Sequence, residues 1–395
     1  MPKISVFQKG EKRSFEVENG ETLLKVLRKN GVEVYSPCGG NGTCGKCKVF
    51  IKGEGSVSSC LYPVNEDIEI VLPDKREANI LIDQHALTVQ LALNPGPSGD
   101  LSFYPHGVAI DIGTTSVVFY LVNLFTGSII ETRAIMNPQA KYGADVISRI
   151  NYTAQSPEGL LTLQNEIITA INLQLDHFAA MAGVSADEMV KIAVTGNTTM
   201  LHLLLGVDPL PIALAPFTPA FIEEQHLKGS ELKLHCHPEA EIKILPSIAA
   251  YVGADIVAGI ASIKQMEQYK RFLFMDIGTN GELALVTPDK IWCCATAAGP
   301  AFEGAISVYT PKEFSVIGNF PPVGICGSGL IDVVAHLVEL KLVSSDGLLE
   351  EDFIVVPKED SGTLKDIILT QQDIREVQLA KSAMMAGLNV LLSKA

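Results

Sequence analysis

Residues 36–60 read SPCGGNGTCGKCKVFIKGEGSVSSC and place four cysteines at the spacing C-x5-C-x2-C-x12-C. The first three thiols fall within ten residues of glycine-rich chain. A 2Fe–2S cluster is held by four Cys thiolates, and a glycine-rich loop lets backbone N–H groups approach the cluster sulfurs. The segment therefore predicts an iron–sulfur centre, with the ligands Cys38, Cys44, Cys47 and Cys60.

Other interpretations of this segment are weaker. Four Cys can also hold zinc, but zinc ribbons pair two C-x2-C knuckles and this chain has one. Residues 40–46 fit the phosphate-loop pattern G-x-x-x-x-G-K, and glycines of the same stretch fit G-x-G-x-x-G. Cys47 stands where a phosphate loop requires Ser or Thr. Iron–sulfur is the favoured interpretation, and zinc is the alternative.

The residues around the cysteines alternate as strands do. Residues 3–8 and 13–17 predict a hairpin, residues 20–31 (GETLLKVLRKNG) predict a helix with leucines on one face, and residues 47–51 and 67–72 predict further strands. This segment resembles plant-type and adrenodoxin-type ferredoxins, with a shorter stretch before the fourth Cys. The resemblance implies a β-grasp, ferredoxin-like domain over residues 1–73.

Composition points to a soluble multidomain protein. The chain has 395 residues, of which 47% are hydrophobic, and its length suggests two to three domains. It shows neither a long apolar run nor the apolar region of a signal peptide, so we expect a cytoplasmic protein without membrane contact. The net charge of −15 argues against a nucleic-acid partner. Residues 74–105, which include NPGPSGD, predict a linker.

An internal repeat follows the linker. Residues 108–122 read VAIDIGTTSVVFYLV and residues 272–286 read FLFMDIGTNGELALV. Each predicts a hairpin in which glycine lets the turn approach an anion, N–H and hydroxyl groups face phosphates, and the Asp holds hydrated Mg²⁺. A single copy could be an ordinary β-turn, whereas two facing copies favour a phosphate site. The candidates are Asp111, Gly113, Thr114, Thr115, Asp276, Gly278, Thr279, Asn280, Gly281 and Glu282.

Other segments add weaker candidates. Residues 195–199 (TGNTT) lie between a predicted strand and helix, where they form either an anion site or a simple N-cap. Asp255 falls in the first turn of a predicted helix, where compensation of the helix dipole is a sufficient explanation. Gly299 in AAGPAFEG and the run Gly327-Ser328-Gly329 before the predicted helix LIDVVAHLVEL suggest close backbone approaches, although helix packing could also require glycine there. These candidates are Gly196, Asn197, Thr198, Asp255, Gly299, Gly327, Ser328 and Gly329.

The hairpin pair resembles the two phosphate motifs of the actin, sugar kinase and Hsp70 (ASKHA) superfamily. More narrowly, the chain looks like the ATP-dependent reductive activators of corrinoid proteins. The strings that carry this resemblance, after the cysteine segment, are VAIDIGTTS, NPQAKYGADVISRI, VTGNTTMLHLLLGVDP, FMDIGTNGE, AAGPAFEGA, CGSGLIDVV and LTQQDIREVQLAKSA.

The family implies a two-lobed ASKHA-type nucleotide-binding domain over residues 106–395. It implies an enzyme that takes an electron from an upstream donor through its 2Fe–2S cluster. The electron passes to a cobalamin-binding protein, whose inactive Co(II) returns to Co(I) for anaerobic methyl-transfer metabolism, with hydrolysis of Mg²⁺-bound ATP. The resemblance gives Asp111, Asp276 and Asp255 catalytic roles, and homodimerisation is left open.

The chain departs from the family at its end. Members normally continue past the helix at 373–392 into a further strand and a Gly-rich loop, so we expect a C-terminally shortened second lobe with less certain ATP hydrolysis. The alternative is a 2Fe–2S electron-transfer protein whose degenerate ASKHA part is a docking scaffold. A small-molecule kinase is a third hypothesis, weakened by the fused ferredoxin.

Overall fold

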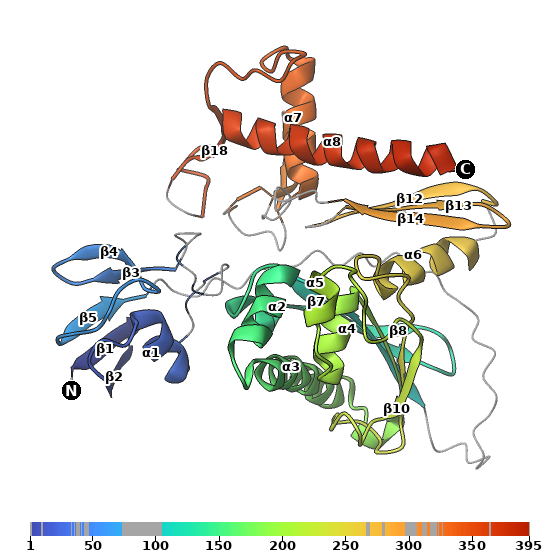
Figure 1. Cartoon of the computed structure of the whole chain (residues 1–395), viewed down its shortest axis with the longest axis horizontal. Helices are drawn as coiled ribbons and strands as arrows, with labels where there is room; N and C mark the ends of the chain where they lie inside the picture. Colours follow the sequence, from blue (N-terminus) through green and yellow to red (C-terminus); the bar gives the residue numbers. More distant parts are fainter. Residues whose placement is uncertain are drawn as a thin grey trace.

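The chain folds into a small N-terminal domain followed by two larger lobes (Figure 1). This is a computed structural model, in which the described residues are 2–8, 11–32, 34, 36, 40, 42, 47–72, 105–265, 269–278, 281–296, 306–309, 314–316, 322, 324–325, 327–362 and 365–394. Several predicted features lie outside this set: Cys38, Cys44, Thr279, Asn280, Gly299 and nearly all of the linker 74–105.

The N-terminal domain is a five-stranded sheet with one helix packed against it. Its elements are β1 (Lys3–Gln8), β2 (Glu11–Glu16), α1 (Leu23–Lys29), β3 (Lys48–Ile51), β4 (Gly55–Ser58) and β5 (Ile68–Val71). The strand order is β2-β1-β5-β3-β4, and among these described strands β1 and β5 pair in parallel while the other pairs are antiparallel. This confirms the predicted ferredoxin-like fold. Strand β4 was not predicted.

The periodicity of α1 explains how this domain closes. Leu23, Leu24 and Leu27 are buried, and they pack in one cluster with Ile4 and Ile70 of the sheet. Residues three and four apart lie on one face of a helix, so a single apolar stripe is enough to cover the sheet.

The first lobe is built on a six-stranded sheet with the order β10-β11-β9-β6-β7-β8. Its strands are β6 (His106–Ile112), β7 (Ser116–Asn123), β8 (Ile129–Met136), β9 (Met189–Gly196), β10 (Gln225–Lys228) and β11 (Glu241–Ile244). Strands β6, β7 and β8 form an antiparallel meander, and β9 then pairs in parallel with β6. The parallel pairing brings the carboxyl ends of β6 and β9 to the same edge of the sheet.

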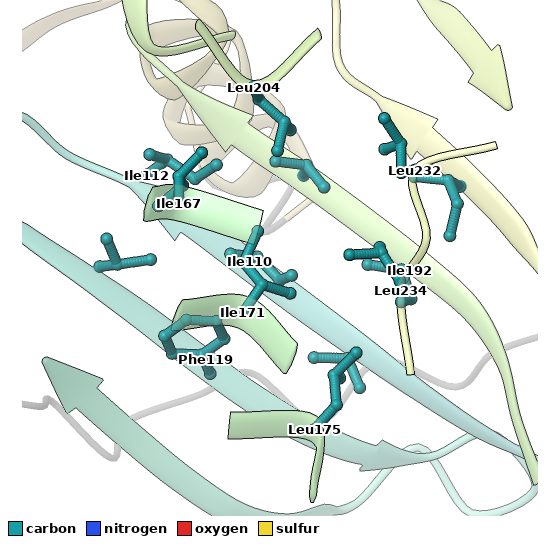
Figure 2. Packing of buried hydrophobic residues seen from close by; sticks show 14 of the residues in the cluster. Ile110, Ile112, Phe119, Ile167, Ile171, Leu175, Ile192, Leu204, Leu232 and Leu234 are labelled. Atoms are coloured by element: carbon teal, nitrogen blue, oxygen red, sulfur yellow. The ribbon is translucent and has the colours of Figure 1, made fainter. Parts of the chain in front are cut away.

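Helices cover one face of this sheet. The helical segments are η1 (Pro138–Lys141), α2 (Val146–Gln155), α3 (Gly159–Ala182), η2 (Ala186–Glu188), α4 (Thr198–Leu205), α5 (Leu210–Ala213) and α6 (Ala254–Gln265). Figure 2 shows Ile110, Ile112 and Ile192 of the sheet packed with Ile167 and Ile171 of α3. Because side chains alternate along a strand, Asp111 lies on the face opposite this core.

The second lobe starts with the three-stranded antiparallel sheet β12-β13-β14. Its strands are β12 (Phe272–Ile277), β13 (Gly281–Val286) and β14 (Ile291–Thr296). Val252, Ile256 and Ile260 pack with Ala284 and Val286, which places α6 against one face of the sheet. The other face is covered by α8 (Gln371–Lys394), which runs along the sheet in Figure 1.

The rest of the second lobe is a smaller unit with its own apolar cluster. It contains β15 (Ile306–Tyr309), β16 (Phe314–Val316), α7 (Gly327–Glu339), β17 (Phe353–Val356) and β18 (Ile367–Leu369). Val333 and Leu337 of α7 pack with Val356 and Leu369. The glycines expected before α7 form its first turn instead, where backbone N–H groups have no partner inside the helix.

Among the described helices, none has both the length and the apolar character needed to cross a membrane.

Candidate functional site

Two of the predicted cluster ligands are described, and they lie together. The sulfurs of Cys47 and Cys60 are 3.2 Å apart, and both residues are buried. No disulfide joins these two sulfurs. Two adjacent thiols can ligate one iron of a 2Fe–2S cluster, so this pair fits the predicted group.

Hydrogen bonds favour the thiolate at Cys47. Burial alone would raise the pKa of Cys47, but hydrogen bonds from the backbone and thiol of Cys60 and from Ser59 outweigh it and lower the pKa. Ser59 also binds the carbonyl of Cys47 through both its N–H, at 2.9 Å, and its hydroxyl, at 2.8 Å. The thiolate is the form that binds metals, so the environment matches a ligand.

Glycines in the cysteine segment adopt a backbone conformation that other residues rarely take. Gly40 has φ +103° and Gly42 has φ +77°. A Cβ atom at Gly42 would lie 2.9 Å from the side chain of Leu61. The positive φ angles therefore favour glycine at both positions.

Each hairpin carries the sequence Asp-Ile-Gly-Thr, at residues 111–114 and 276–279, and is called an Asp-Gly hairpin below. The first Asp-Gly hairpin joins β6 to β7, and its turn is held by buried polar side chains. Asn137 donates through Nδ2 to the carbonyl of Gly113 at 2.7 Å and through its N–H to the carbonyl of Thr115 at 2.8 Å. Arg149, which is fully buried, donates to the carbonyl of Thr114. It also binds the carbonyl of Gly143 at 2.8 Å. The turn is thus fixed from outside the hairpin.

The segment after β9 meets this turn. Asn197 accepts a hydrogen bond from the N–H of Met200 at 3.0 Å, which makes it the N-cap of α4. The same side chain donates to Thr114 Oγ1 at 3.0 Å. The N-cap interpretation is therefore confirmed, and the cap also contacts the first hairpin. Gly196 has φ +150°, and a Cβ atom there would lie 2.5 Å from the carbonyl oxygen of Ile112.

The start of α6 packs closely on the same turn. A Cβ atom at Gly253 would lie 2.5 Å from Asn197 Cα, 2.8 Å from the carbonyl oxygen of Gly196 and 2.7 Å from Asp255 Oδ1. The approach is between backbones, so only glycine fits. It brings the Asp255 carboxylate beside the carboxyl end of β9.

The second hairpin joins β12 to β13. Asp276 and Glu282 are register partners on the two strands, and their side chains lie on the α6 side with Ala284 and Val286. Gly278 directly follows β12, and Gly281 begins β13 as a buried residue. Thr296 Oγ1 donates to the carbonyl of Gly281 at 3.0 Å.

Four carboxyl groups of these elements influence one another. Burial, with the charge of Asp276, raises the pKa of Asp111 to about 6. Burial, with the charges of Asp111 and Asp276, raises the pKa of Asp255 to about 6. Burial also raises the pKa of Asp276, and burial with the charges of Asp255 and Asp276 raises the pKa of Glu282 to about 8.

Among the described residues, no positively charged side chain contributes to the pKa values of these four carboxyl groups, the carboxylate cluster. Mutual repulsion and burial both oppose ionisation, so a bound cation would lower all four pKa values. Mg²⁺ takes one or two carboxylates and keeps several waters, so it can bind without direct chelation by three side chains. Within the described residues, no three His, Cys, Asp or Glu side chains are placed to chelate a metal directly.

Sequence reasoning missed the residues that support the site from a distance. Asn137 and Arg149 belong to NPQAKYGADVISRI, and the only available signals were Asn before Pro at the end of a strand and a basic residue on the apolar face of α2. Gly253 carried no signal beyond its position next to a predicted helix, and Thr195 was noted only as the first residue of the TGNTT segment. Ser328 and its neighbouring glycines lie in the first turn of α7.

The first lobe also contacts the N-terminal domain. Arg28 of α1 donates to the carbonyl of Lys141, and its guanidinium lies 5.7 Å from the centre of the Tyr142 ring. Tyr142 and Lys141 both bind Glu166 of α3, at 3.0 and 2.7 Å. Residues 137–142 therefore contact the first hairpin through Asn137 and the N-terminal domain through their other end.

Three families match consecutive parts of the chain. Residues 6–72 match the 2Fe-2S iron-sulfur cluster binding domain, residues 106–268 the RACo middle region, and residues 270–395 the C-terminal domain of RACo, described as the ASKHA domain.

Two relatives and a solved structure are similar to most of the chain. The corrinoid activation enzyme RamQ of Eubacterium limosum is 27% identical over 94% of this chain and 80% of its own length. A reductase of the "Co(II) methylated amine-specific corrinoid protein" of Methanosarcina barkeri is 24% identical over 71% of this chain, which spans 58% of that relative.

The solved structure titled "Reductive activator for corrinoid,iron-sulfur protein" superposes with a TM-score of 0.67 at 28% identity, covering all of this chain and 84% of that one. The chain thus belongs to the RACo family, with a 2Fe–2S cluster-binding domain, a RACo middle region and a C-terminal ASKHA domain in that order.

Proposed function

We propose that this chain is an ATP-dependent reductive activator of a corrinoid protein. An upstream donor reduces its 2Fe–2S cluster, and the cluster passes one electron to cobalamin, so that Co(II) becomes Co(I). ATP hydrolysis accompanies the transfer because this reduction is uphill. The corrinoid protein is the partner by analogy with RamQ and with the reductase of Methanosarcina barkeri.

The observation that carries the proposal is the presence of two different chemistries in one chain. A buried thiol pair lies in the glycine-rich segment of a ferredoxin-like domain. Two Asp-Gly hairpins from separate lobes bring Asp111 and Asp276 close enough for the charge of one to raise the pKa of the other. An electron carrier alone needs only the first of these features.

The cluster would be held by Cys38, Cys44, Cys47 and Cys60. When bound, it supplies one-electron chemistry without proton transfer. The chain contributes a buried pair of thiols at Cys47 and Cys60, and hydrogen bonds favour the thiolate form of Cys47.

The nucleotide phosphates would lie between the hairpins. Three groups of residues would contact the phosphates. The first lobe supplies Gly113, Thr114 and Thr115 from its hairpin and Gly196, Asn197 and Thr198 at the start of α4. The second lobe supplies Gly278, Thr279, Asn280 and Gly281. Asp111 and Asp276 would orient the waters of Mg²⁺, and Asp255 and Glu282 are the other two members of the carboxylate cluster. Gly299, Gly327, Ser328 and Gly329 would approach the rest of the nucleotide.

Residues 137–142 supply a physical connection between the two chemistries. They hold the turn that would contact phosphate, and they also bind Arg28 of the cluster domain. A change in the turn on hydrolysis can therefore alter how the cluster domain sits, which is the coupling that the reaction requires.

The test is reduction of a purified Co(II) corrinoid protein under anaerobic conditions, with a chemical electron donor and with or without Mg²⁺-ATP. We expect Co(I) absorbance to appear with ATP and the wild-type chain only. Cys47→Ser should remove the cluster absorbance, and Asp276→Asn should retain the cluster but give no Co(I). Equal Co(I) formation with and without ATP would instead support the electron-transfer protein with an ASKHA docking scaffold.

A further inference from the structure

Thr195 occupies an unusual position at the end of β9. It is the register partner of Asp111 on the parallel strand β6. Ile192 and Val194 of β9 point into the core, as do Ile110 and Ile112 of β6. Because side chains alternate along a strand, Thr195 and Asp111 lie on the opposite face of the sheet. The Thr195 hydroxyl is buried and finds no hydrogen-bond partner within the described part of the chain.

The neighbouring polar side chains do not share this property. Asn197 uses its carbonyl for the N–H of Met200 and its amide for Thr114. Thr198 donates through Oγ1 to the carbonyl of Ala249 at 2.7 Å. The fold thus uses the polar groups on either side of the turn, and it leaves the hydroxyl of Thr195 unused.

An unused buried hydroxyl is costly. Leaving such a group unsatisfied costs about 1–3 kcal/mol, and a valine of the same shape would avoid that cost. An unsatisfied hydroxyl at a site lined by charged groups points to a hydrogen-bond partner that binds together with the substrate.

The groups around Thr195 restrict what that partner is. Asp111 lies beside it on β6, and the backbone contact of Gly253 with Gly196 and Asn197 brings Asp255 Oδ1 to the same strand end. Carboxylates repel a phosphate oxygen but accept a proton from water. The hydroxyl of Thr195 can accept the other proton of that water.

We propose that Thr195 is a positioning residue for the water that attacks the terminal phosphate of ATP, held between its hydroxyl and the Asp255 carboxylate. This inference rests on the proposed function. The water oxygen forms a bond to the γ-phosphorus, and the bond from that phosphorus to the oxygen bridging to ADP breaks. The water proton passes to Asp255 and then to solvent, so atoms and charge balance without a further reactant.

The test is Thr195→Val against Thr195→Ser in the full-length chain. Valine keeps the shape and removes the hydroxyl, so kcat for ATP hydrolysis should fall by about 10–100-fold while KM for ATP changes little. Its melting temperature should be equal to or above that of the wild type, because the unsatisfied hydroxyl is gone. Serine should restore kcat to within a few-fold of the wild-type value.

Thr198→Val is the matched control three residues along the chain. It removes a hydroxyl that is hydrogen-bonded to Ala249, so it should lower the melting temperature. The inference on Thr195 alone is overturned if Thr195→Val keeps the wild-type kcat, raises only KM or melts earlier than the wild type. A wild-type chain that hydrolyses no ATP overturns both this inference and the proposed function. The failure of the inference alone is therefore distinguishable from the failure of the proposed function.

Discussion

The two Asp-Gly hairpins share a motif but differ in their support. In the first lobe, β6 pairs with β7 on one side and β9 on the other. In the second lobe, β12 pairs with β13, and no other described strand lies along its outer edge. Leu273, Met275 and Ile277 of β12 are 37%, 41% and 41% exposed. The motif specifies a turn and a carboxylate, whereas distant segments decide how firmly they are held.

The hairpins also differ in charge. The first supplies the single carboxylate of Asp111, while the second supplies Asp276 and Glu282 in register. Burial and two neighbouring charges raise the pKa of Glu282 to about 8. The second hairpin is therefore the one whose ionisation depends more on a bound cation.

Removing the carboxylate at the same position of each hairpin, Asp111 or Asp276, gives the sharpest test of the two hairpins. We expect Asp111→Asn and Asp276→Asn each to lower ATP turnover by about 100-fold or more, because both carboxylates would orient the waters of the Mg²⁺ that binds the phosphates. Turnover can be measured by phosphate release. Asp289→Asn, in the exposed turn after β13, is the control and should retain activity. If only Asp111→Asn is inactive, the second hairpin has been misassigned.

The support of the first hairpin can be broken at Arg149. Arg149→Met should lower the free energy of unfolding by about 3 kcal/mol, because the carbonyls of Thr114 and Gly143 lose a buried charged donor. Urea denaturation measures this loss. The exposed Arg375 of α8 contacts Gln378, and Arg375→Met should cost about 0.5 kcal/mol or less. Equal losses for the two variants would contradict a structural role for Arg149.

The carboxylate cluster predicts a pH dependence of stability. The pKa values of Asp111 and Asp255 are raised from 3.8 to about 6, and that of Glu282 from 4.5 to about 8. The folded state then holds protons that the unfolded state has released, so stability falls as pH rises from about 4 to about 8.

Urea midpoints between pH 5 and pH 8, without nucleotide or Mg²⁺, test this direction. Glu282→Gln should flatten the upper part of the fall, above pH about 6, because the neutral amide carries no charge to desolvate. Glu350→Gln, at an exposed position of the second lobe, should leave the slope unchanged. A slope that is the same in all three proteins would show that the cluster is not buried as described.

The smallest expected effect concerns the contact between the cluster domain and the first lobe. A double-mutant cycle of Arg28→Ala with Tyr142→Ala should give a coupling free energy of about 0.5–1 kcal/mol, typical of a cation–π pair. Arg13 lies 5.7 Å from the Phe15 ring, within its own domain, and is the matched control. The cycle of Arg13→Ala with Tyr142→Ala should show no coupling. Equal coupling in both cycles would rule out a specific contact.

Much of the local structure could be predicted because it follows short-range periodicity. The hairpin at residues 3–16, the helix starting near Leu23 and both Asp-Gly hairpins appear where the pattern indicated. The boundary of α7 was misplaced by three residues, since glycine and serine are tolerated in a first turn that needs no internal partner. Strand β4 has few apolar residues and gave no alternating signal.

The sequence by itself determined the chemistry of this protein: four thiols at a cluster spacing, and two Asp-Gly turns that each present a carboxylate. Those features are local, because residue type and spacing alone specify them. Only the tertiary structure decided that Arg149 and Asn137 hold one turn and that Gly253 brings Asp255 to the end of β9. It also decided that the buried Thr195 hydroxyl there has no hydrogen-bond partner among the described residues. Such contacts join segments far apart in the chain, so their energies depend on packing that no local pattern records.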